Sequence, residues 1–157
     1  EPLQIQALER LCDALVHHPL TGRVISIHAV RSAGTVLDVL ESHGLLTPRP
    51  DSPVITFHWF SGTSDELVRA HDAGCFFSVS ERMLATKRGR EYARQIPLDR
   101  ILLETDAPSN PKADTTARQL ITSLKSVSRR IAELKNCAEE SVESTVLRNS
   151  RSIFDFR

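Results

Sequence analysis

Short apolar segments rich in β-branched residues alternate with helical segments along the chain, and this alternation constrains the fold more than any other feature. Strand-like runs lie at residues 24–30, 54–60, 75–80 and 101–106. Helical periodicity and helix start or stop signals mark residues 3–18, 32–42, 64–71, 81–95, 115–134 and 139–154. Proline-bearing loops lie at 46–53 and 107–111. Parallel neighbours need crossover connections, so this order predicts a parallel sheet with helices outside it.

Four βα units fit two kinds of α/β fold. A complete (β/α)₈ barrel of the TIM type takes about 250 residues, so a chain of 157 residues matches roughly its carboxy-terminal half. The alternative is a small open α/β sheet, and the order of elements does not choose between them. In either case we expect residues 1–157 to form a single domain.

The composition is that of a globular protein without a global charge. Twenty Lys and Arg balance twenty Asp and Glu, so any nucleic-acid substrate must be held by a local site. Three cysteines without a C-x-x-C pair argue against a disulfide framework or a zinc knuckle and favour a reducing compartment. No apolar run approaches the length of a membrane span and no leader is visible, so we expect a cytoplasmic protein without membrane contact.

Three residues that bind metals in other proteins follow three of the predicted strands. His28, His58 and Asp106 each lie at or near the carboxyl end of a strand, where functional groups of parallel α/β folds collect. Two imidazoles and a carboxylate suit Zn²⁺ or Mn²⁺, and Mg²⁺ when water and phosphate complete the shell. The alternative is that each is a hydrogen-bonded structural residue. The remaining histidines are assigned to structure or solvent: His17, His18, His43 and His71.

Three sequence blocks resemble, in order and spacing, signature blocks of the TatD-like deoxyribonucleases. They are Ser26-Ile27-His28 with Arg31 and Ala33, Phe57-His58-Trp59-Phe60-Ser61-Gly62, and Leu103-Glu104-Thr105-Asp106-Ala107-Pro108. Asn149 to Phe154 also resembles the closing helix of that family, so the resemblance covers nearly the whole chain. Trp59, where the common pattern has Cys, and Phe76-Phe77-Ser78-Val79 are similar to the subgroup found in Qat anti-phage systems.

This resemblance implies a metal-dependent hydrolase of DNA phosphodiesters, acting on single strands or free ends. In that reading His28 and His58 bind one divalent ion, Mg²⁺, Mn²⁺ or Zn²⁺. Asp106 is both a ligand and the acceptor of a proton from the attacking water. Membership of the Qat subgroup would add partner proteins encoded in a defence operon.

Three further residues are candidates for the site, each with an ordinary structural alternative. Glu104, two residues before Asp106 and so on the same side of a predicted strand, is a candidate catalytic or substrate-side carboxylate, or else a buried structural one. Arg31 is a candidate phosphate clamp, or else a surface residue. Trp59 is a candidate for stacking on a nucleobase, or else packs in the core.

The sequence departs from the family pattern at its start. The family's amino-terminal half supplies an H-x-H pair and a Glu that bridges two metals, and nothing here matches them. Residue 1 is Glu and the opening residues read as the middle of a larger protein, so we expect a partial barrel without its amino-terminal strands. Such a chain leaves strand edges unpaired, and we expect it to fold poorly and have low activity alone.

Two other functions are compatible with the sequence. Related metal barrels hydrolyse small molecules such as lactones or cyclic amides, and the neutral charge balance permits this. The second is a non-catalytic binding role within a multi-protein system.

Overall fold

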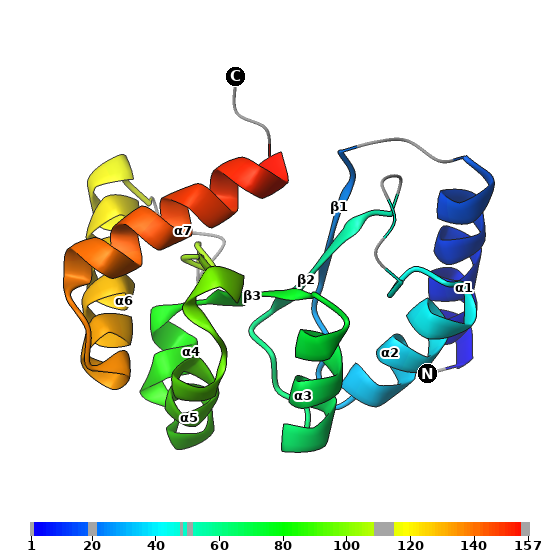
Figure 1. Cartoon of the computed structure of the whole chain (residues 1–157), viewed down its shortest axis with the longest axis horizontal. Coiled ribbons are helices and arrows are strands. Elements are labelled where there is room, and N and C mark those ends of the chain that lie inside the picture. The colour runs from blue at the N-terminus through cyan, green and yellow to red at the C-terminus, as the bar shows by residue number, and fades with distance from the viewer. Residues whose placement is uncertain (1, 19–21, 48, 50–51, 109–114, 155–157) are drawn as a thin grey trace. The chain divides into compact units, whose positions relative to one another are not determined.

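A computed structural model describes residues 2–18, 22–47, 49, 52–108 and 115–154 of the chain. Two predicted loops lie partly outside these residues, at 48 and 50–51 and at 109–111. The chain forms two compact units, one of residues 1–76 and 153–157 and the other of residues 77–152. Four strands are ordered β1-β2-β3-β4 in a parallel sheet with helices flanking it, which confirms the α/β prediction (Figure 1).

The first unit contains two strands and three helices. Their bounds are α1 (Pro2–His17), β1 (Val24–Ile27), α2 (Ala33–Ser42), β2 (Val54–His58) and α3 (Ser64–Asp72). β1 and β2 pair in parallel from Val24↔Val54 to Ile27↔Phe57. In this unit α1 packs against α2, and α2 against α3.

The core of the first unit follows from the apolar stripe of α2. Val36, Leu37 and Leu40 recur at helical spacing and are buried, as the periodicity predicts. The helix stops where Gly44 takes a left-handed φ of 68°, which lets the amide of Leu45 donate to the carbonyl of Leu40 at 2.9 Å. The predicted glycine stop is therefore confirmed.

The prediction that Ser64 or Asp65 caps α3 is wrong, because the cap is Thr63, one residue before Ser64. Thr63 has an extended backbone, and its hydroxyl accepts a hydrogen bond from the Glu66 amide at 3.2 Å. The Glu66 carboxylate in turn accepts from the Thr63 amide at 2.6 Å. This reciprocal capping box satisfies two amides at once, which a cap at Ser64 or Asp65 would not do.

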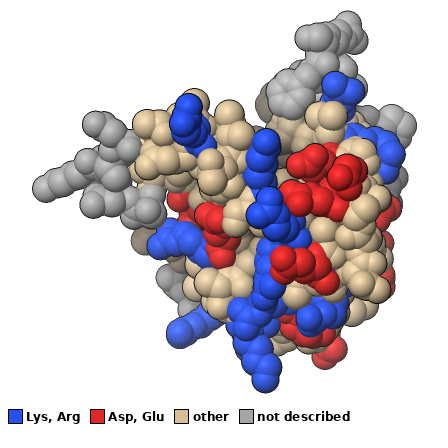
Figure 2. Space-filling view, turned by 90° about the vertical axis from the view of Figure 1, so that its left-hand side faces the viewer, with Lys and Arg blue, Asp and Glu red and all other residues tan. Residues whose placement is uncertain are grey.

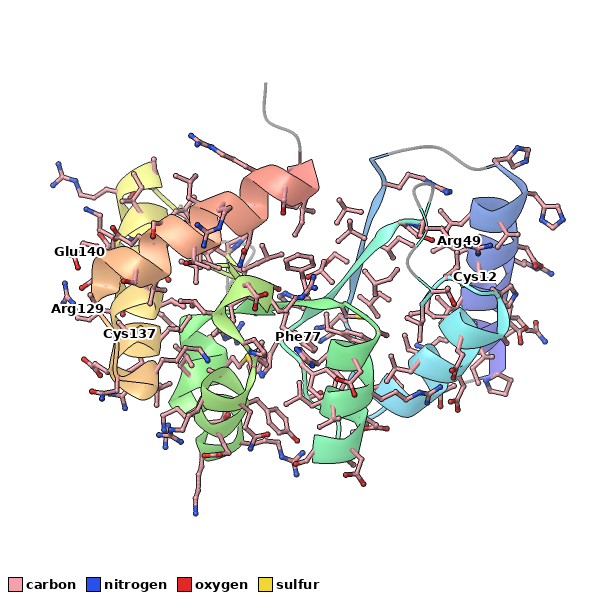
Figure 3. All side chains as sticks on the ribbon, viewed as in Figure 1. Cys12, Arg49, Phe77, Arg129, Cys137 and Glu140 are labelled. Atoms are coloured by element: carbon pink, nitrogen blue, oxygen red, sulfur yellow. The ribbon has the colours of Figure 1, made fainter. Side chains whose placement is uncertain are left out.

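The second unit contains the remaining strands and helices, apart from the first residue of β3 and the last two of α7. Their bounds are β3 (Phe76–Val79), α4 (Glu81–Ala85), α5 (Lys87–Gln95), the 3₁₀ turn η1 (Leu98–Arg100), β4 (Ile101–Leu103), α6 (Ala117–Lys135) and α7 (Glu139–Phe154). β3 and β4 pair in parallel from Phe77↔Ile101 to Val79↔Leu103. Every residue of β3 is buried, and Phe77, which Figure 3 labels on this strand, is fully so.

The single helix predicted over residues 81–95 is wrong, because the chain forms α4 and α5 with a break at Thr86. Thr86 is extended, and its hydroxyl accepts from the Gly89 amide at 2.9 Å to start the second helix. A Cβ on Gly89 would lie 2.0 Å from the Met83 carbonyl oxygen, so only glycine permits this close turn. The side chain of Arg90 donates to the carbonyls of Leu84 and Ala85 at the end of α4.

Asn149 on α7 connects that helix to the start of β4. Its buried side-chain amide donates to the carbonyl of Leu98 at 3.0 Å and to that of Ile101 at 2.8 Å. The amide thereby satisfies two carbonyls where the chain enters the strand. The asparagine in the closing helix thus has a structural role that fixes where β4 begins.

All four strands are shorter than the segments predicted to form them. The runs 24–30 and 101–106 become four and three residues, and 54–60 and 75–80 become five and four. Beyond the strands, Trp59 and Asp106 have left-handed backbone. β1 is also less covered than a doubly buried strand, since Ser26 is exposed.

The outer face of the second unit carries charges of both signs. Figure 2 shows Lys and Arg side chains in a band on this face, with Asp and Glu on either side of it. On α6, Arg129 pairs with Glu139 at 3.4 Å and Arg130 with Glu133 at 2.5 Å. Among the helices that the structure describes, none is long and apolar enough to cross a membrane.

Candidate functional site

The parallel register of the first unit brings His28 and His58 together. His28 follows the last residue of β1, and His58 is the last residue of β2. The final registered pair is Ile27↔Phe57, so the two histidines are the next residues along both strands. Their ring centroids lie 4.9 Å apart, with the ring planes tilted by 47°. His28 is exposed and His58 half-buried.

The geometry of this pair fits a shared metal ion. Two imidazoles bound tetrahedrally at Zn–N distances of about 2.0–2.1 Å have ring centroids about 5 Å apart. Neutral imidazole is also a common ligand for Mn²⁺ and other transition metals. Within the described residues, no group of three or more His, Cys, Asp or Glu side chains gathers closely enough to hold an ion. The complete set of His28, His58 and Asp106 therefore stays a prediction.

The loops that follow β1 and β2 are held to each other beside the histidines. The hydroxyl of Ser61 donates to the carbonyl of Ala29 at 3.2 Å. The rings of Phe57 and Phe60 pack edge to face with centroids 5.5 Å apart, and both are buried. The histidine pair is therefore carried by a tied segment at the strand ends.

Left-handed backbone conformations concentrate at the predicted site residues. Arg31, Trp59 and Asp106 have φ angles of 55°, 42° and 52°, respectively. Such angles are unfavourable for residues with a Cβ, and strained backbone collects at functional positions. The other non-glycine residue with positive φ in the described part of the chain is Asn136, the ordinary left-handed cap of α6. Backbone strain therefore independently marks three of the six candidate residues.

Glu104 lies beyond the end of β4 in the second unit. Its amide donates to the carbonyl of Val79 at 3.0 Å, which continues the pairing of β3 and β4 by one bond. Its Oε2 accepts a hydrogen bond from the hydroxyl of Ser78, a buried residue of β3. The carboxylate is half-buried and oriented by a strand neighbour.

Asp106 is bound by an arginine of α4. Its Oδ2 lies 3.1 Å from Nη1 of Arg82. The expectation that Glu104 and Asp106 share one side of a strand is wrong, because the strand ends at Leu103 and strand alternation does not apply beyond it. The two carboxylates instead have separate partners, Ser78 and Arg82.

Arg31 and Trp59 lie close in sequence to the two histidines. Arg31 is exposed, three residues after His28, which suits contact with a ligand and equally a surface position. Trp59 is half-buried and directly follows His58, so it is neither a core residue nor a fully exposed one. Val30 is also exposed here, at 58%.

Three of the remaining histidines lie close to polar groups of helices, as expected for structural residues. His17 Nδ1 lies 2.7 Å from the carbonyl of Asp13 one helical turn earlier. His43 lies 3.3 Å from the Asp13 carboxylate, and His71 lies 3.0 Å from the carboxylate of Asp72.

The partners of the two carboxylates, Ser78 for Glu104 and Arg82 for Asp106, were not identified from the sequence. A polar residue within the apolar run 75–80 was a signal for Ser78, since a buried hydroxyl needs a partner. Arg82 had no distinguishing signal, because it is one of several basic residues between 82 and 94.

Comparison with solved structures identifies the class of fold. The chain superposes on YJJV, a TatD homolog from Escherichia coli K12, with a TM-score of 0.67 and 21% sequence identity, over 85% of this chain and 51% of that one. Together with the parallel sheet and its flanking helices, this assigns the chain to part of a TIM-type barrel.

Sequence comparison then gives the family. The model of the TatD related DNase family matches residues 3–155, and the chain belongs to that family. It is 34% identical to the Deoxyribonuclease Tat-D of Schizosaccharomyces pombe over 52% of this chain and 25% of the relative. It is 36% identical to the 3′-5′ ssDNA/RNA exonuclease TatD of Dickeya dadantii over 54% and 35%, respectively.

A metal-dependent relative matches over a longer stretch. The chain is 23% identical to an uncharacterized metal-dependent hydrolase of Haemophilus influenzae over 83% of this chain and 49% of that protein. The chain thus spans about half the length of this relative, and its matches to the S. pombe and D. dadantii proteins cover a quarter to a third of theirs.

Proposed function

We propose that the protein carrying this chain hydrolyses phosphodiester bonds of DNA with a divalent metal ion. The observation that carries the proposal is the pairing of His28 and His58 at 4.9 Å at the ends of two parallel strands. Membership of the TatD related DNase family and the metal-dependent relative support it. The ion is Mg²⁺, Mn²⁺ or Zn²⁺.

The residues have distinct roles in this proposal. His28, His58 and Asp106 would hold the ion. When bound, the ion lowers the pKa of water and offsets negative charge on the phosphoryl oxygens. Asp106 would accept the proton of the attacking water. Glu104 is a candidate catalytic or substrate-side carboxylate, and the hydrogen bond from Ser78 fixes the orientation of its side chain.

Arg31 and Trp59 are the proposed substrate contacts. A guanidinium matches the geometry of a phosphate, and Arg31 is exposed. The indole of Trp59 offers a face on which a nucleobase can stack, an interaction that requires an unpaired base. The name of the D. dadantii relative, an exonuclease of single-stranded DNA and RNA, supports a single-stranded substrate with a free end.

The similarity of His58-Trp59-Phe60 to the Qat subgroup extends this proposal to anti-phage defence. In that setting the nuclease acts with partner proteins of the same operon in the cytoplasm. Phage plating on cells that carry the operon tests this role. An Asp106→Asn substitution should abolish protection, and retained protection would favour a non-catalytic binding role.

The nuclease activity is tested with single-stranded DNA labelled at either the 5′ or the 3′ end. The gene product that carries this chain is assayed with Mg²⁺, Mn²⁺ and Zn²⁺ in turn, alongside His28→Ala, His58→Ala and Asp106→Asn. His71→Ala is the matched control, because His71 lies on α3 beside Asp72. We expect each site variant to lose about 100-fold or more in rate, since a metal ligand is removed, and the control to remain within about twofold.

Two results would contradict the proposal. Unchanged cleavage by Asp106→Asn would remove this residue from the reaction. Absence of cleavage with every metal, combined with turnover of a lactone or cyclic amide, would assign the site to a small molecule.

A further inference from the structure

Helix α6 carries an excess of positive charge on its exposed side. Five of its residues are Lys or Arg, and one, Glu133, is acidic. Two of the five basic residues have local partners. Arg130 pairs with Glu133 at 2.5 Å, and the half-buried Lys135 donates to the carbonyl of Arg94 at 3.1 Å. Three exposed basic residues remain, which we call the basic stripe: Arg118, Lys125 and Arg129.

The basic stripe follows one line along α6. Its members are separated by seven and four residues, a spacing that places them on one face of a helix, and the stripe is about 16 Å long. Within the part of the chain that the structure describes, Arg118 and Lys125 form no ion pair. Arg129 is 3.4 Å from Glu139, but its side chain is 69% exposed, so water screens this pair and the arginine can change partner. Figure 2 shows that Lys and Arg side chains gather on this side of the second unit.

An apolar groove lies beside the basic stripe, between α6 and α7. The groove has a volume of about 290 Å³, and its apolar lining comes from Leu103 of β4, Leu124 of α6, and Val146 and Leu147 of α7. Leu147 is 52% exposed. Lys125 also lines the groove and so belongs to both features. The surface therefore joins a line of positive charge to a place where an apolar group can be buried.

This combination fits a strand that has charged phosphates and unpaired bases. The phosphates of such a strand can contact the basic stripe, and the exposed hydroxyls of Thr122 and Ser126 on α6 can donate hydrogen bonds to them. An unpaired base can turn into an apolar groove, whereas the bases of a duplex stay paired and stacked. We infer that α6 and α7 form a binding surface for single-stranded nucleic acid, with the backbone along the basic stripe and a base in the groove.

The groove also has an acidic side, which orients the strand. Glu143 of α7 is exposed and lines the groove. Its carboxylate repels phosphates, so the backbone lies on the α6 side. All of these residues belong to the second unit, whereas His28 and His58 belong to the first. The inference rests on the proposed function only for the class of ligand and needs no metal ion.

The experiment measures binding of a fluorescent dT oligonucleotide by anisotropy, in EDTA so that no divalent ion contributes. The protein is the gene product that carries this chain. In the stripe variant, all three residues of the basic stripe become Gln. The matched control is Arg10→Gln/Lys87→Gln/Arg88→Gln, which removes three exposed positive charges from α1 and α5 and so changes the net charge equally.

We expect the stripe variant to bind the dT strand about 10- to 100-fold more weakly at about 0.1 M salt, while the control stays within about twofold. The slope of log Kd against log salt should fall by about 2 in the stripe variant and by about 0.7 in each single Gln variant, because each phosphate contact on a single strand contributes about 0.7. Glu143→Gln should tighten binding by about two- to threefold, since it removes a repulsion.

The groove is tested with an abasic strand of the same length. Leu147→Gln should weaken binding of the dT strand by about three- to tenfold and leave the abasic strand unchanged, because only a base enters the groove. Val68→Gln is the matched control, since Val68 on α3 is 55% exposed, and it should leave both strands unchanged.

Three results would overturn the inference. Equal weakening in the stripe variant and its control would reduce the effect to net charge. An equal loss for the dT and abasic strands in Leu147→Gln would mean that no base enters the groove. Stripe-dependent binding of vesicles of phosphatidylcholine and phosphatidylserine, without binding of the dT strand, would assign the surface to a membrane.

Failure of the proposed function gives a different result. Stripe-dependent binding of the dT strand without cleavage by any metal would remove the nuclease activity and support the binding surface. Cleavage by a stripe variant that binds the dT strand as the wild type does would support the nuclease activity and overturn the binding surface.

Discussion

The hydroxyl of Ser78 donates a hydrogen bond to Oε2 of Glu104, which joins the middle of β3 to the residue just after β4. Ser78 is buried and Glu104 half-buried, so water does not easily replace this donor. This hydrogen bond explains why a serine occurs in the otherwise apolar strand β3. The contact stabilises the fold and fixes the direction of a candidate catalytic carboxylate.

Replacing Ser78 with alanine should lower the free energy of unfolding by about 2 kcal/mol, because a hydrogen bond to a charged group is lost at a buried position. Ser123→Ala is the control, since its hydroxyl donates to the exposed carboxylate of Glu81, and we expect it to cost about 0.5 kcal/mol or less. Urea denaturation of both variants measures the difference. An equal loss in the free energy of unfolding for both variants would mean that the hydrogen bond from Ser78 to Glu104 does not stabilise the fold.

The protein should be more stable with glycine than with alanine at position 31. The φ of 55° at Arg31 is unfavourable for any residue with a Cβ, and glycine adopts it freely. We expect Arg31→Gly to exceed Arg31→Ala by about 1 kcal/mol in the free energy of unfolding. Lys125 on α6 provides the reverse control, since alanine should exceed glycine there by about 1 kcal/mol within a helix.

Chemical denaturation of the four variants tests this prediction. The opposite signs at positions 31 and 125 exclude a general effect of glycine on the unfolded chain. Equal stability of Arg31→Gly and Arg31→Ala would show that position 31 carries no backbone strain. If Arg31 also binds phosphate, both of its variants should raise KM for DNA alike.

The proximity of the two histidines could be predicted from the sequence. Both follow short apolar runs, and parallel strands place their carboxyl ends at one edge. The observed register offset of 30 residues, Val24↔Val54, equals the separation of His28 and His58. The order of the elements and the glycine stop at Gly44 were also predictable, because each depends on local periodicity or on one residue's conformational freedom.

Other features depend on contacts that sequence spacing does not record. The predicted strand 101–106 turns polar after Leu103, where β4 ends, but nothing in Glu104 to Asp106 indicates that Asp106 becomes left-handed. The break at Thr86 depends on the close approach of Gly89 to the Met83 carbonyl. The partnership of Arg82 with Asp106 spans 24 residues, and nothing local distinguishes Arg82 from its basic neighbours.

Cys12 and Cys75 are both buried and should be unreactive thiols in the folded protein, whereas the exposed Cys137 should react. Figure 3 labels Cys12, which is fully buried on α1, and Cys137, which is exposed after α6. Burial, followed by the charges of Asp13 and Glu9, raises the pKa of the Cys12 thiol above its ordinary 9.0. At pH 8 a disulfide reagent should modify Cys137 in the folded protein, and Cys12 and Cys75 only after unfolding.

The same pKa shift of Cys12 has a consequence for stability. Above pH 9.0 the unfolded thiol loses its proton before the folded one, so the folded state binds more protons and the free energy of unfolding falls as pH rises. Cys12→Ala should lack this component of the decline. Denaturation at pH 8 and pH 10 compares the two proteins, and identical declines would contradict the shift.

Metal binding at the histidine pair should stabilise the folded protein. An ion that binds the folded state alone adds about 2.7 kcal/mol at a concentration 100 times its Kd, which raises Tm by about 5–10 °C for a domain of this size. We expect this rise with Mn²⁺ in a thermal melt, reversed by a chelator. His28→Ala and His58→Ala should each remove most of it, because their rings lie 4.9 Å apart and, in the proposed function, both bind the ion. His71→Ala should keep it, since His71 lies beside Asp72 on α3. A full rise in the variant lacking both His28 and His58 would place the ion elsewhere and leave the 4.9 Å contact as packing of two rings.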